Sequence, residues 1–309
     1  MELIRGWHNL RPRHRGCVAT IGNFDGVHRG HRAVLARLDE VSRELRLPST
    51  LLIFEPHPLE FLRPEAAPPR LTSLRNKLHA LRSTNLDRVL CLRFDRRFAD
   101  LEAGSFVRDL LVERLGVRFL LVGDDFRFGR GRSGDFAMLQ RAGQEYGFAV
   151  EQMATVLVDG ARASSTRVRQ ALLAGDLDLA RRLLGRPYSI CGRVVHGDRI
   201  GRTLGFPTAN ISLEHTRPAP SGIFVVQVRD DGVVRPAVAS LGTRPTVGGK
   251  RLLLEVHLLD YRGDLYGRHL EVEFLKRLRG EEMFDSLEAL RAQIARDVEA
   301  ARDYFAASR

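Results

Sequence analysis

Apolar and polar positions follow two different patterns along the chain. Through the first 185 residues, short apolar runs alternate with stretches whose apolar residues recur every three or four positions. Between the first two runs, Val34, Leu38, Val41 and Leu45 fall on one face of a helix. We predict strands at 17–22, 50–54, 88–92, 118–122 and 149–156, and further helices at 71–81, 102–115, 135–146 and 166–184. This order predicts a Rossmann-like α/β domain with helices on a parallel sheet, whereas the proline-rich segment 56–69 is predicted to be loop.

Beyond residue 185, short β-branched segments recur with Gly and Pro between them. We predict strands at 188–196, 222–229, 233–241, 251–260 and 269–274, which indicate a small antiparallel barrel or sandwich, and we expect the barrel. A helix from Asp285 to Phe305 closes the chain, with Asp285 as its N-cap. Its predicted buried stripe consists of Leu287, Leu290, Ile294, Val298, Ala301 and Phe305. The pattern therefore predicts two domains, 1–185 and 186–309.

Composition narrows the class of protein. An apolar fraction of 44% with 28% charged residues is typical of a globular domain, and neither a signal peptide nor a membrane span is expected. Cys17, Cys91 and Cys191 are too few and too widely spaced for a disulfide framework or a zinc site, which favours the cytoplasm. The net charge of +11 comes almost wholly from arginines scattered among acidic residues. We therefore expect no nucleic-acid partner and no membrane partner.

The segment Gly22-Asn-Phe-Asp-Gly-Val-His-Arg-Gly-His31 follows the first strand and opens the first helix. Backbone N–H groups and the positive end of the helix dipole favour phosphate at such a turn. His28 and His31 are three residues apart, so both rings can reach one anion, and Gly30 allows close approach. An H-x-G-H at a strand-to-helix turn is the signature of class I adenylyl-transfer sites, which indicates ATP. The expected binding residues of the turn are Gly22, Asn23, Phe24 and Gly30.

A second phosphate-handling candidate is Ser164-Ser-Thr-Arg-Val-Arg169, which again opens a helix. Ser165 and Thr166 can cap that helix, and Arg169 lies one turn into it. Aminoacyl-tRNA synthetases share the H-x-G-H but pair it with a lysine-rich motif, and this chain has only three lysines. Taken alone, the segment is also compatible with a capped amphipathic helix.

Two further segments end predicted parallel strands, where ligands bind in open α/β sheets. They are Phe54-Glu-Pro-His-Pro58 and Gly123-Asp-Asp-Phe-Arg-Phe-Gly129. Both mix aromatic residues or prolines with polar groups, which suits a flat ring in an apolar slot. Ordinary loop packing is the alternative for each aromatic residue taken singly.

In the C-terminal half, Gly201-Arg-Thr-Leu-Gly-Phe-Pro-Thr-Ala-Asn210 combines a glycine-containing flap with two oxygen-bearing side chains. Gly201 and Gly205 permit backbone donors to face phosphates, and Thr208 and Asn210 alternate onto one side as ligands for Mg²⁺. Glu255 lies on the second face of an otherwise apolar strand, which fits either a solvated edge residue or a general base.

Together, the N-terminal motifs resemble the FMN adenylyltransferase module of prokaryotic bifunctional riboflavin kinase/FMN adenylyltransferases (FAD synthetases). The resemblance implies a nucleotidyltransferase domain in which His28, His31, Ser165, Thr166 and Arg169 handle ATP phosphates. It also implies that Pro56, Pro58, Leu62 and Phe128 lie near the flavin ring and that Asp125, where many relatives have Asn, contacts adenosine or ribose.

The C-terminal motifs resemble the riboflavin kinase module of the same family. They are Gly201–Asn210, Leu254-Glu-Val-His-Leu-Leu-Asp260, Asp264-Leu-Tyr-Gly267 and the segment from Arg279 to Glu288. The resemblance implies that Thr208 and Asn210 hold Mg²⁺, that Glu255 deprotonates the ribityl 5′-hydroxyl, and that Arg279 belongs to the binding site. Ser240 stands where relatives often have Asn.

The leading hypothesis is thus a bifunctional enzyme. Riboflavin and ATP would give FMN and ADP, and FMN and a second ATP would give FAD and pyrophosphate. Two alternatives remain: another class I adenylyltransferase acting on tRNA or a small molecule, and a non-catalytic flavin-binding protein of the same fold.

Overall fold

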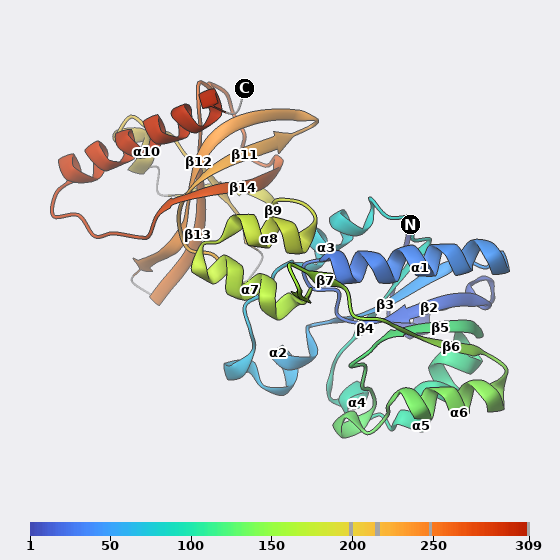
Figure 1. Cartoon of the computed structure of the whole chain (residues 1–309). Helices are drawn as coiled ribbons and strands as arrows, with labels where there is room; N and C mark the ends of the chain where they lie inside the picture. The colour runs from blue at the N-terminus through green and yellow to red at the C-terminus, as the bar shows by residue number, and fades with distance from the viewer. Residues whose placement is uncertain (198–199, 214–216, 247–248, 308–309) are drawn as a thin grey trace. The chain divides into compact units, whose positions relative to one another are not determined.

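The computed structural model describes residues 1–197, 200–213, 217–246 and 249–307 (Figure 1). The chain forms two compact units, which are described separately below. The first unit comprises Met1–Pro68 and Lys77–Ser164, and the second comprises Pro69–Asn76 and Ser165–Arg309. Among the described residues, no helix is both long enough and apolar enough to cross a bilayer.

The first unit is built on a six-stranded parallel sheet with the order β1-β4-β3-β2-β5-β6. Its strands are β1 Glu2–Arg5, β2 Cys17–Ile21, β3 Ser49–Glu55, β4 Arg88–Arg93, β5 Val117–Gly123 and β6 Ala149–Met153. All five predicted strands are present. The edge strand β1 was not predicted, because four residues with a charge at each end carry no clear apolar pattern.

Helices cover both faces of this sheet, with α1 Arg29–Leu45 on one face and α6 Phe136–Tyr146 on the other (Figure 1). The Asp135 carboxylate accepts a hydrogen bond from the Met138 backbone N–H at 2.9 Å and so caps α6. The other elements are α4 Arg96–Ala99, α5 Ala103–Ser105, a π-helix Phe106–Arg114, and the hairpin β7 Leu157–Val158 and β8 Ala161–Arg162. Short 3₁₀ turns lie at Trp7–Asn9, Pro12–His14 and Arg130–Arg132.

The prediction that 56–69 is loop throughout is wrong. Helix α2 spans Pro58–Leu62 and a 3₁₀ turn spans Pro64–Ala66. Proline is tolerated at the first helical position, where its missing N–H would have no partner in any case. The His57 ring accepts a hydrogen bond from the Leu59 N–H, and Glu60 accepts one from the His57 N–H. This capping box compensates for the short length of α2.

The second unit contains a closed antiparallel barrel, the architecture predicted for this half, and its strand order is β10-β13-β12-β11-β14-β9. Its strands are β9 Tyr188–Val195, β10 Ala209–Ile211, β11 Gly222–Asp230, β12 Val233–Thr246, β13 Gly249–Leu258 and β14 His269–Arg279. The three-residue β10 was not predicted. The helices are α3 Leu74–Leu81, which begins in this unit, α7 Ser165–Ala174, α8 Leu177–Leu184, α9 Ile200–Thr203 and α10 Leu287–Ala307.

The prediction of one helix over 166–184 is wrong. Gly175 has φ of +78° and ends α7, and Asp176 then caps α8 by accepting from the Leu179 N–H at 2.8 Å. Both helices belong to the compact unit that contains the barrel.

The closing helix α10 packs on the outside of the barrel (Figure 1), where Val298 and Ala301 contact Val225, Val238 and Leu259. Two details of its prediction are wrong. The N-cap is Ser286, whose hydroxyl accepts from the Ala289 N–H at 3.1 Å. Leu287 is 62% exposed and lies outside the buried stripe.

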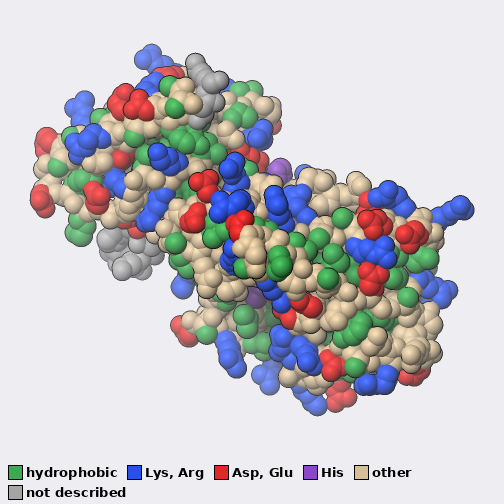
Figure 2. Space-filling view, viewed as in Figure 1, with side chains coloured by type: hydrophobic (Ala, Val, Ile, Leu, Met, Phe, Trp, Pro, Cys, Tyr) green, Lys and Arg blue, Asp and Glu red, His purple; other side chains and the backbone are tan. Residues whose placement is uncertain are grey.

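Arginine and lysine side chains alternate with acidic ones on the face shown in Figure 2. Ion pairs between such side chains occur in both units, for example Arg96 with Asp100 at 2.8 Å and Arg302 with Asp260 at 2.7 Å. On this face the positive charge is spread out, as the sequence predicts.

Candidate functional site

The first candidate site is the turn between β2 and α1. Phe24 and Val27 both adopt positive φ, at 50° and 46°, so the chain turns sharply within four residues. Both side chains are buried, at 3% and 0% exposure, and this packing holds the backbone in a conformation that non-glycine residues rarely adopt. The turn is therefore rigid, and it places His28 at the N-cap of α1.

Three rings stack in this turn. The His28 and His31 rings lie 3.7 Å apart, and the His31 ring lies 4.4 Å from that of Phe24. The His28 Nδ1 accepts a hydrogen bond from the His31 backbone N–H at 3.4 Å, which fixes the His28 ring plane. The two histidine rings therefore lie side by side at the start of α1.

His31 is held in its neutral form. Burial lowers the pKa of His31 well below its ordinary value, and the nearby His28 and Lys77 lower it further. The His31 Nδ1 and the Asn23 Oδ1 are buried and have no hydrogen-bond partner among the described residues. Such atoms are rare in folded proteins, so these two are candidates for hydrogen bonds to a ligand.

Gly30 lies in close packing with its neighbours. A Cβ at this position would lie 3.1 Å from two atoms of the His28 ring and 3.2 Å from the Ala163 carbonyl oxygen. A larger residue would thus displace the ring that caps α1. The Gly22 position is similarly close to the Phe24 ring, at 3.1 Å.

The residues predicted to lie near the flavin ring differ in their exposure to solvent. Pro58 is the first residue of α2 and Pro56 precedes it by two residues, whereas Leu62 at the end of that helix is 54% exposed. Phe128 is only 7% exposed, and its ring lies 5.6 Å from that of Phe126 within the core of the first unit. Asp125 is exposed and pairs with Arg162 at 3.1 Å.

Aromatic rings continue this apolar region, and one of them, Phe94, was not singled out from the sequence. The Phe61 ring of α2 lies 5.9 Å from that of Phe94, which in turn lies 6.0 Å from Phe54. Phe94 follows the carboxyl end of β4, the same sheet edge that Phe54 occupies. Phe94 could have been found from the sequence, because it is an aromatic residue just after a predicted strand, and ligands bind at the carboxyl ends of strands in open α/β sheets.

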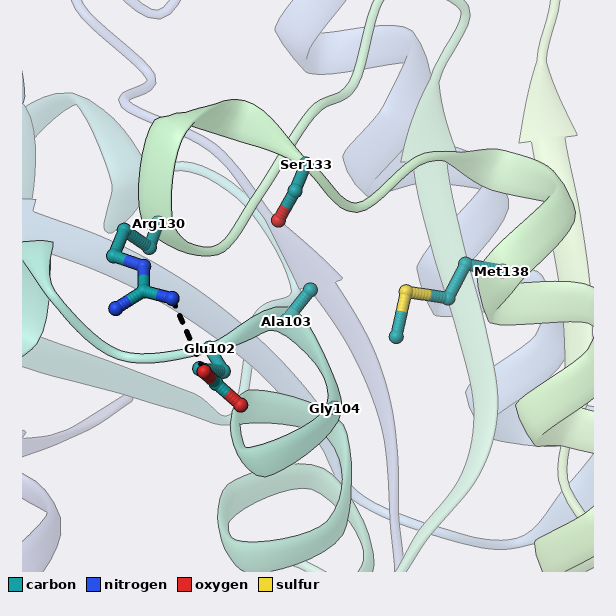
Figure 3. A pocket seen from close by; sticks show the side chains of 6 residues that line it. All are labelled: Glu102, Ala103, Gly104, Arg130, Ser133 and Met138. Atoms are coloured by element: carbon teal, nitrogen blue, oxygen red, sulfur yellow. Dashed lines mark hydrogen bonds and ion pairs between the residues drawn. The ribbon is translucent and has the colours of Figure 1, made fainter.

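A shallow pocket of about 290 Å³ lies elsewhere in the first unit (Figure 3). Arg130 and Glu102 form an ion pair of 3.1 Å at its rim, and Met138 and Ser133 face it from the other side. None of the predicted site residues lines this pocket.

The predicted phosphate-handling residues Ser165, Thr166 and Arg169 lie on α7. This helix begins at Ser165, so the cap position falls on Ser164 and not on Ser165 or Thr166 as predicted. The Arg169 Nε donates a hydrogen bond to the Pro69 carbonyl at 2.6 Å.

The second candidate site is a row of residues across three strands of the barrel. Asn210 of β10 lies directly opposite Glu255 of β13, and Glu255 lies directly opposite Ser240 of β12. Residues paired in this way share one face of the sheet. Since Leu254 and Val256 point into the barrel with no exposure, the three polar side chains lie on its outer face.

The loop before β10 is fastened beside this row. The His257 Nδ1 lies 2.8 Å from the Pro207 carbonyl oxygen, and the Phe206 ring meets the His257 ring edge-on at 5.6 Å. Gly205 has φ of +89°, and a Cβ on Gly201 would lie 3.2 Å from the Thr208 hydroxyl. Both glycines are therefore needed for the conformation that presents Thr208.

The oxygen donors of this site fit a magnesium ion. Thr208 and Asn210 are separated by one residue, and Asn210 is 8% exposed beside the Glu255 position. Hydroxyl, amide and carboxylate oxygens are the ligands that Mg²⁺ prefers, together with phosphate oxygens of a nucleotide.

Arg279 continues the same row but is held from the side of the closing helix. It lies opposite Ile223 of β11, which lies opposite Ser240. Its guanidinium donates to the Asp297 carboxylate of α10, with Nη2 at 2.8 Å and Nε at 3.1 Å. The Asp297 side chain is 7% exposed, so this is a buried ion pair that anchors α10.

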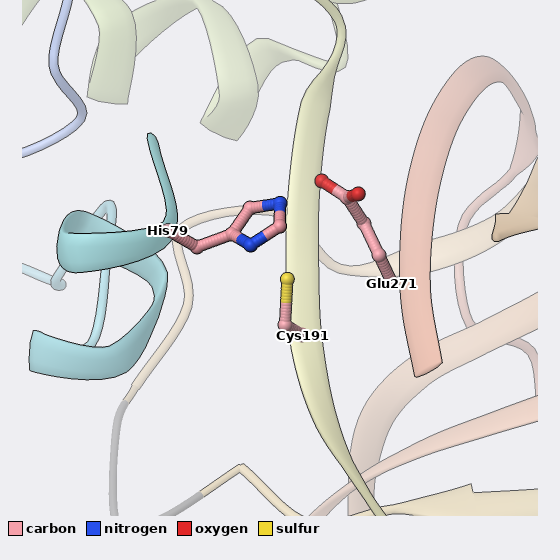
Figure 4. A group of neighbouring side chains, drawn as sticks. All are labelled: His79, Cys191 and Glu271. Carbon is pink, nitrogen blue, oxygen red and sulfur yellow. The ribbon is translucent and has the colours of Figure 1, made fainter. Parts of the chain in front are cut away.

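Thiolate chemistry is disfavoured in both units. Cys191 of β9 and Glu271 of β14 are direct cross-strand neighbours (Figure 4), whereas His79 in that figure belongs to the first unit. Burial and the Glu271 carboxylate raise the pKa of the Cys191 thiol to about 12. Burial likewise raises the pKa of Cys17 to about 11.

Both halves of the chain match known protein families. A family model for FAD synthetase matches residues 10–167, and one for riboflavin kinase matches residues 184–305. Bifunctional riboflavin kinase/FMN adenylyltransferases from Escherichia coli and Pseudomonas fluorescens are each 56% identical to the chain. The alignments cover 99% and 100% of the chain and 98% and 99% of those proteins.

The fold agrees with an experimental structure. A crystal structure described as a macrolide-efflux protein from Streptococcus pneumoniae superimposes with a TM-score of 0.82 at 29% identity, covering 98% of this chain and 99% of that one. Neither the tRNA-linked alternative nor the non-catalytic one finds support among the relatives named above.

Proposed function

The chain belongs to the family of bifunctional riboflavin kinase/FMN adenylyltransferases, and we propose which of its residues carry out each reaction. The protein phosphorylates riboflavin to FMN with ATP and then transfers the adenylyl group of a second ATP to FMN, giving FAD and pyrophosphate. The functional domains proposed for these reactions are 1–185 for adenylyl transfer and 186–309 for the kinase.

For adenylyl transfer, His28 and His31 are the proposed catalytic pair at the start of α1. A neutral His31 donates a hydrogen bond to a phosphate oxygen without needing a proton from solvent, and charge then develops on the α-phosphate and the leaving pyrophosphate. Ser165, Thr166 and Arg169 bind phosphate in the same reaction. Pro56, Pro58, Leu62 and Phe128 form or support the flavin side, and Asp125 contacts the nucleoside.

For the kinase, Glu255 is the proposed general base and Thr208 and Asn210 the Mg²⁺ ligands. The metal ion supplies positive charge that neutralises the phosphates of ATP when bound. Glu255 accepts the proton of the ribityl 5′-hydroxyl as that oxygen attacks the γ-phosphate, and ADP leaves. Gly201 and Gly205 let the loop approach the phosphates, and Arg279 supports the site through α10.

The observation that carries this assignment is the register that sets Asn210 directly opposite Glu255. A carboxylate base and a metal ligand are useful to a kinase only if they lie at the same phosphate, and the pairing of Asn210 with Glu255 on neighbouring strands supports this arrangement. The three unpaired cysteines support a reducing compartment, and we propose the cytoplasm.

The test is the product profile from riboflavin and ATP with and without Mg²⁺. With the metal, both FMN and FAD should appear on chromatography, and FMN should precede FAD. With a chelator added, FMN formation should stop. Formation of FAD from added FMN without any FMN from riboflavin would refute the kinase assignment.

A further inference from the structure

The segment Pro69–Asn76, called the strap below, belongs to the compact unit of the barrel although both its neighbours in sequence belong to the first unit. It is well packed there, since Leu71 is 1% exposed and Thr72 5%. An eight-residue excursion of this kind needs fixed contacts at its ends, because it would otherwise remain a flexible connection.

Asn76 provides the contact at one end of the strap. In the described part of the chain, β10 pairs with β9 only at Val194 and Val195, and no strand of that part pairs with the preceding residues of β9 on that side. The Asn76 Oδ1 accepts a hydrogen bond from the Cys191 backbone N–H there, at 3.3 Å. Asn76 is 8% exposed, and its own N–H donates to the Ser73 hydroxyl at 3.2 Å.

Further contacts are made by Arg75 and Pro69. The Arg75 Nη1 lies 3.0 Å from a ring nitrogen of His269, the first residue of β14. At the far end of the strap, the Pro69 carbonyl accepts the Arg169 Nε–H at 2.6 Å. A guanidinium is planar, so a hydrogen bond donated by Nε sets the direction of its two Nη groups.

We propose that Asn76 is a positioning residue for adenylyl transfer. By fastening the strap to β9, it holds the Pro69 carbonyl in place and thereby orients the Arg169 guanidinium toward the phosphates of ATP. This inference rests on the role proposed above for Arg169. The kinase reaction uses other residues of the barrel and should not depend on Asn76.

The experiment measures FMN-to-FAD conversion by the full-length Asn76→Ala variant as ATP is varied. The KM for ATP should rise about threefold to tenfold with little change in kcat, as when a hydrogen bond that orients a binding group is lost. FMN formation from riboflavin should keep its wild-type KM values. If the alanine variant folds poorly, Asn76→Ser takes its place. The serine side chain is too short to reach the Cys191 N–H, so this variant should show the same rise in the KM for ATP.

Two comparisons separate positioning from general damage. In Asn76→Asp an oxygen acceptor is retained, so the KM for ATP should return toward the wild-type value. Asn85→Ala removes an exposed asparagine that bonds Asp39 in the first unit and should change neither activity. Thermal unfolding of each variant checks that the fold is intact.

The decisive measurement is the double variant Asn76→Ala with Arg169→Ala. Because Asn76 acts through Arg169, the double variant should have the same KM for ATP as Arg169→Ala alone. Additive effects, or a parallel loss of kinase activity, would overturn the inference. A wild-type KM in Arg169→Ala would instead remove the role proposed for Arg169, and the inference with it.

Discussion

The two candidate sites are built in opposite ways. In the first unit, His28, His31 and Asn23 lie within nine consecutive residues, and one sharp turn brings them together. In the barrel, Asn210, Ser240 and Glu255 are spread over 46 positions, and only strand register places them in one row. The first site is therefore a local structure and the second a product of long-range pairing.

This difference affects how each site tolerates change. The turn is held by buried rings and by two non-glycine residues with positive φ, so a single added methyl group disturbs it. The barrel row is held by backbone hydrogen bonds between the short strand β10 and the long strands β12 and β13, and these bonds do not depend on the side chains in the row. Substitutions in the barrel row should therefore change chemistry with little loss of stability, whereas those in the turn should change both.

The largest effect is expected from Glu255→Gln. Glutamine fills the same space but cannot accept the proton, so FMN formation should fall by about 10²–10⁴-fold. FMN-to-FAD conversion and the melting temperature should stay close to wild type. Rates of both reactions on one preparation provide the measurement, with Glu299→Gln on the exposed face of α10 as the control. Loss of both activities in a folded variant would contradict two separate sites.

A slightly smaller effect is expected from His31→Ala. Removing a hydrogen-bond donor at the developing charge should slow FAD formation by about 10²–10³-fold. Riboflavin phosphorylation should be unaffected, which single-turnover assays of each reaction can verify. His8→Ala removes an exposed histidine of the same unit and is the matched control. Unchanged FAD formation would show that the stacked rings have only a structural role.

Gly30→Ala tests the packing of the turn. Overpacking against the His28 ring and the Ala163 carbonyl should destabilise the first unit by about 1–3 kcal/mol and slow FAD formation. Gly104→Ala is the comparison, because no atom lies within 4 Å of the added Cβ there. Denaturant unfolding of both variants measures the difference. Equal stabilities would mean that the His28 ring moves aside without cost.

The smallest expected effect is on the pH dependence of stability. Because the pKa of His31 is well below 6.5 in the folded state, the unfolded chain binds a proton there that the folded protein does not. The free energy of unfolding should therefore fall as pH is lowered below about 6.5, the ordinary histidine value. In His31→Gln that part of the decline should be absent. Denaturant unfolding at a series of pH values measures the profile of each protein. Identical profiles for the wild type and His31→Gln would rule out a neutral His31.

Local features of the sequence predicted the strand-to-helix turn that holds the first candidate site. Glycines, the H-x-G-H spacing and the strand-to-helix position all act within one turn, so residue order alone implies their proximity. The alternation of Leu254, Glu255 and Val256 likewise predicted which face each would occupy, and the burial of the two apolar residues confirms it. The break at Gly175 was missed, because helical periodicity continues across it.

What the sequence by itself determined is the α/β-then-barrel order of the chain and the chemistry available in each half, since periodicity and turn residues act over a few positions. Only the tertiary structure decided which distant residues meet. Nothing local in Arg279 indicates that its guanidinium binds Asp297, or in Asn76 that its amide bonds to β9. Such partners depend on strand register and on the packing of whole elements, and these are set by the sum of many weak contacts far apart in sequence.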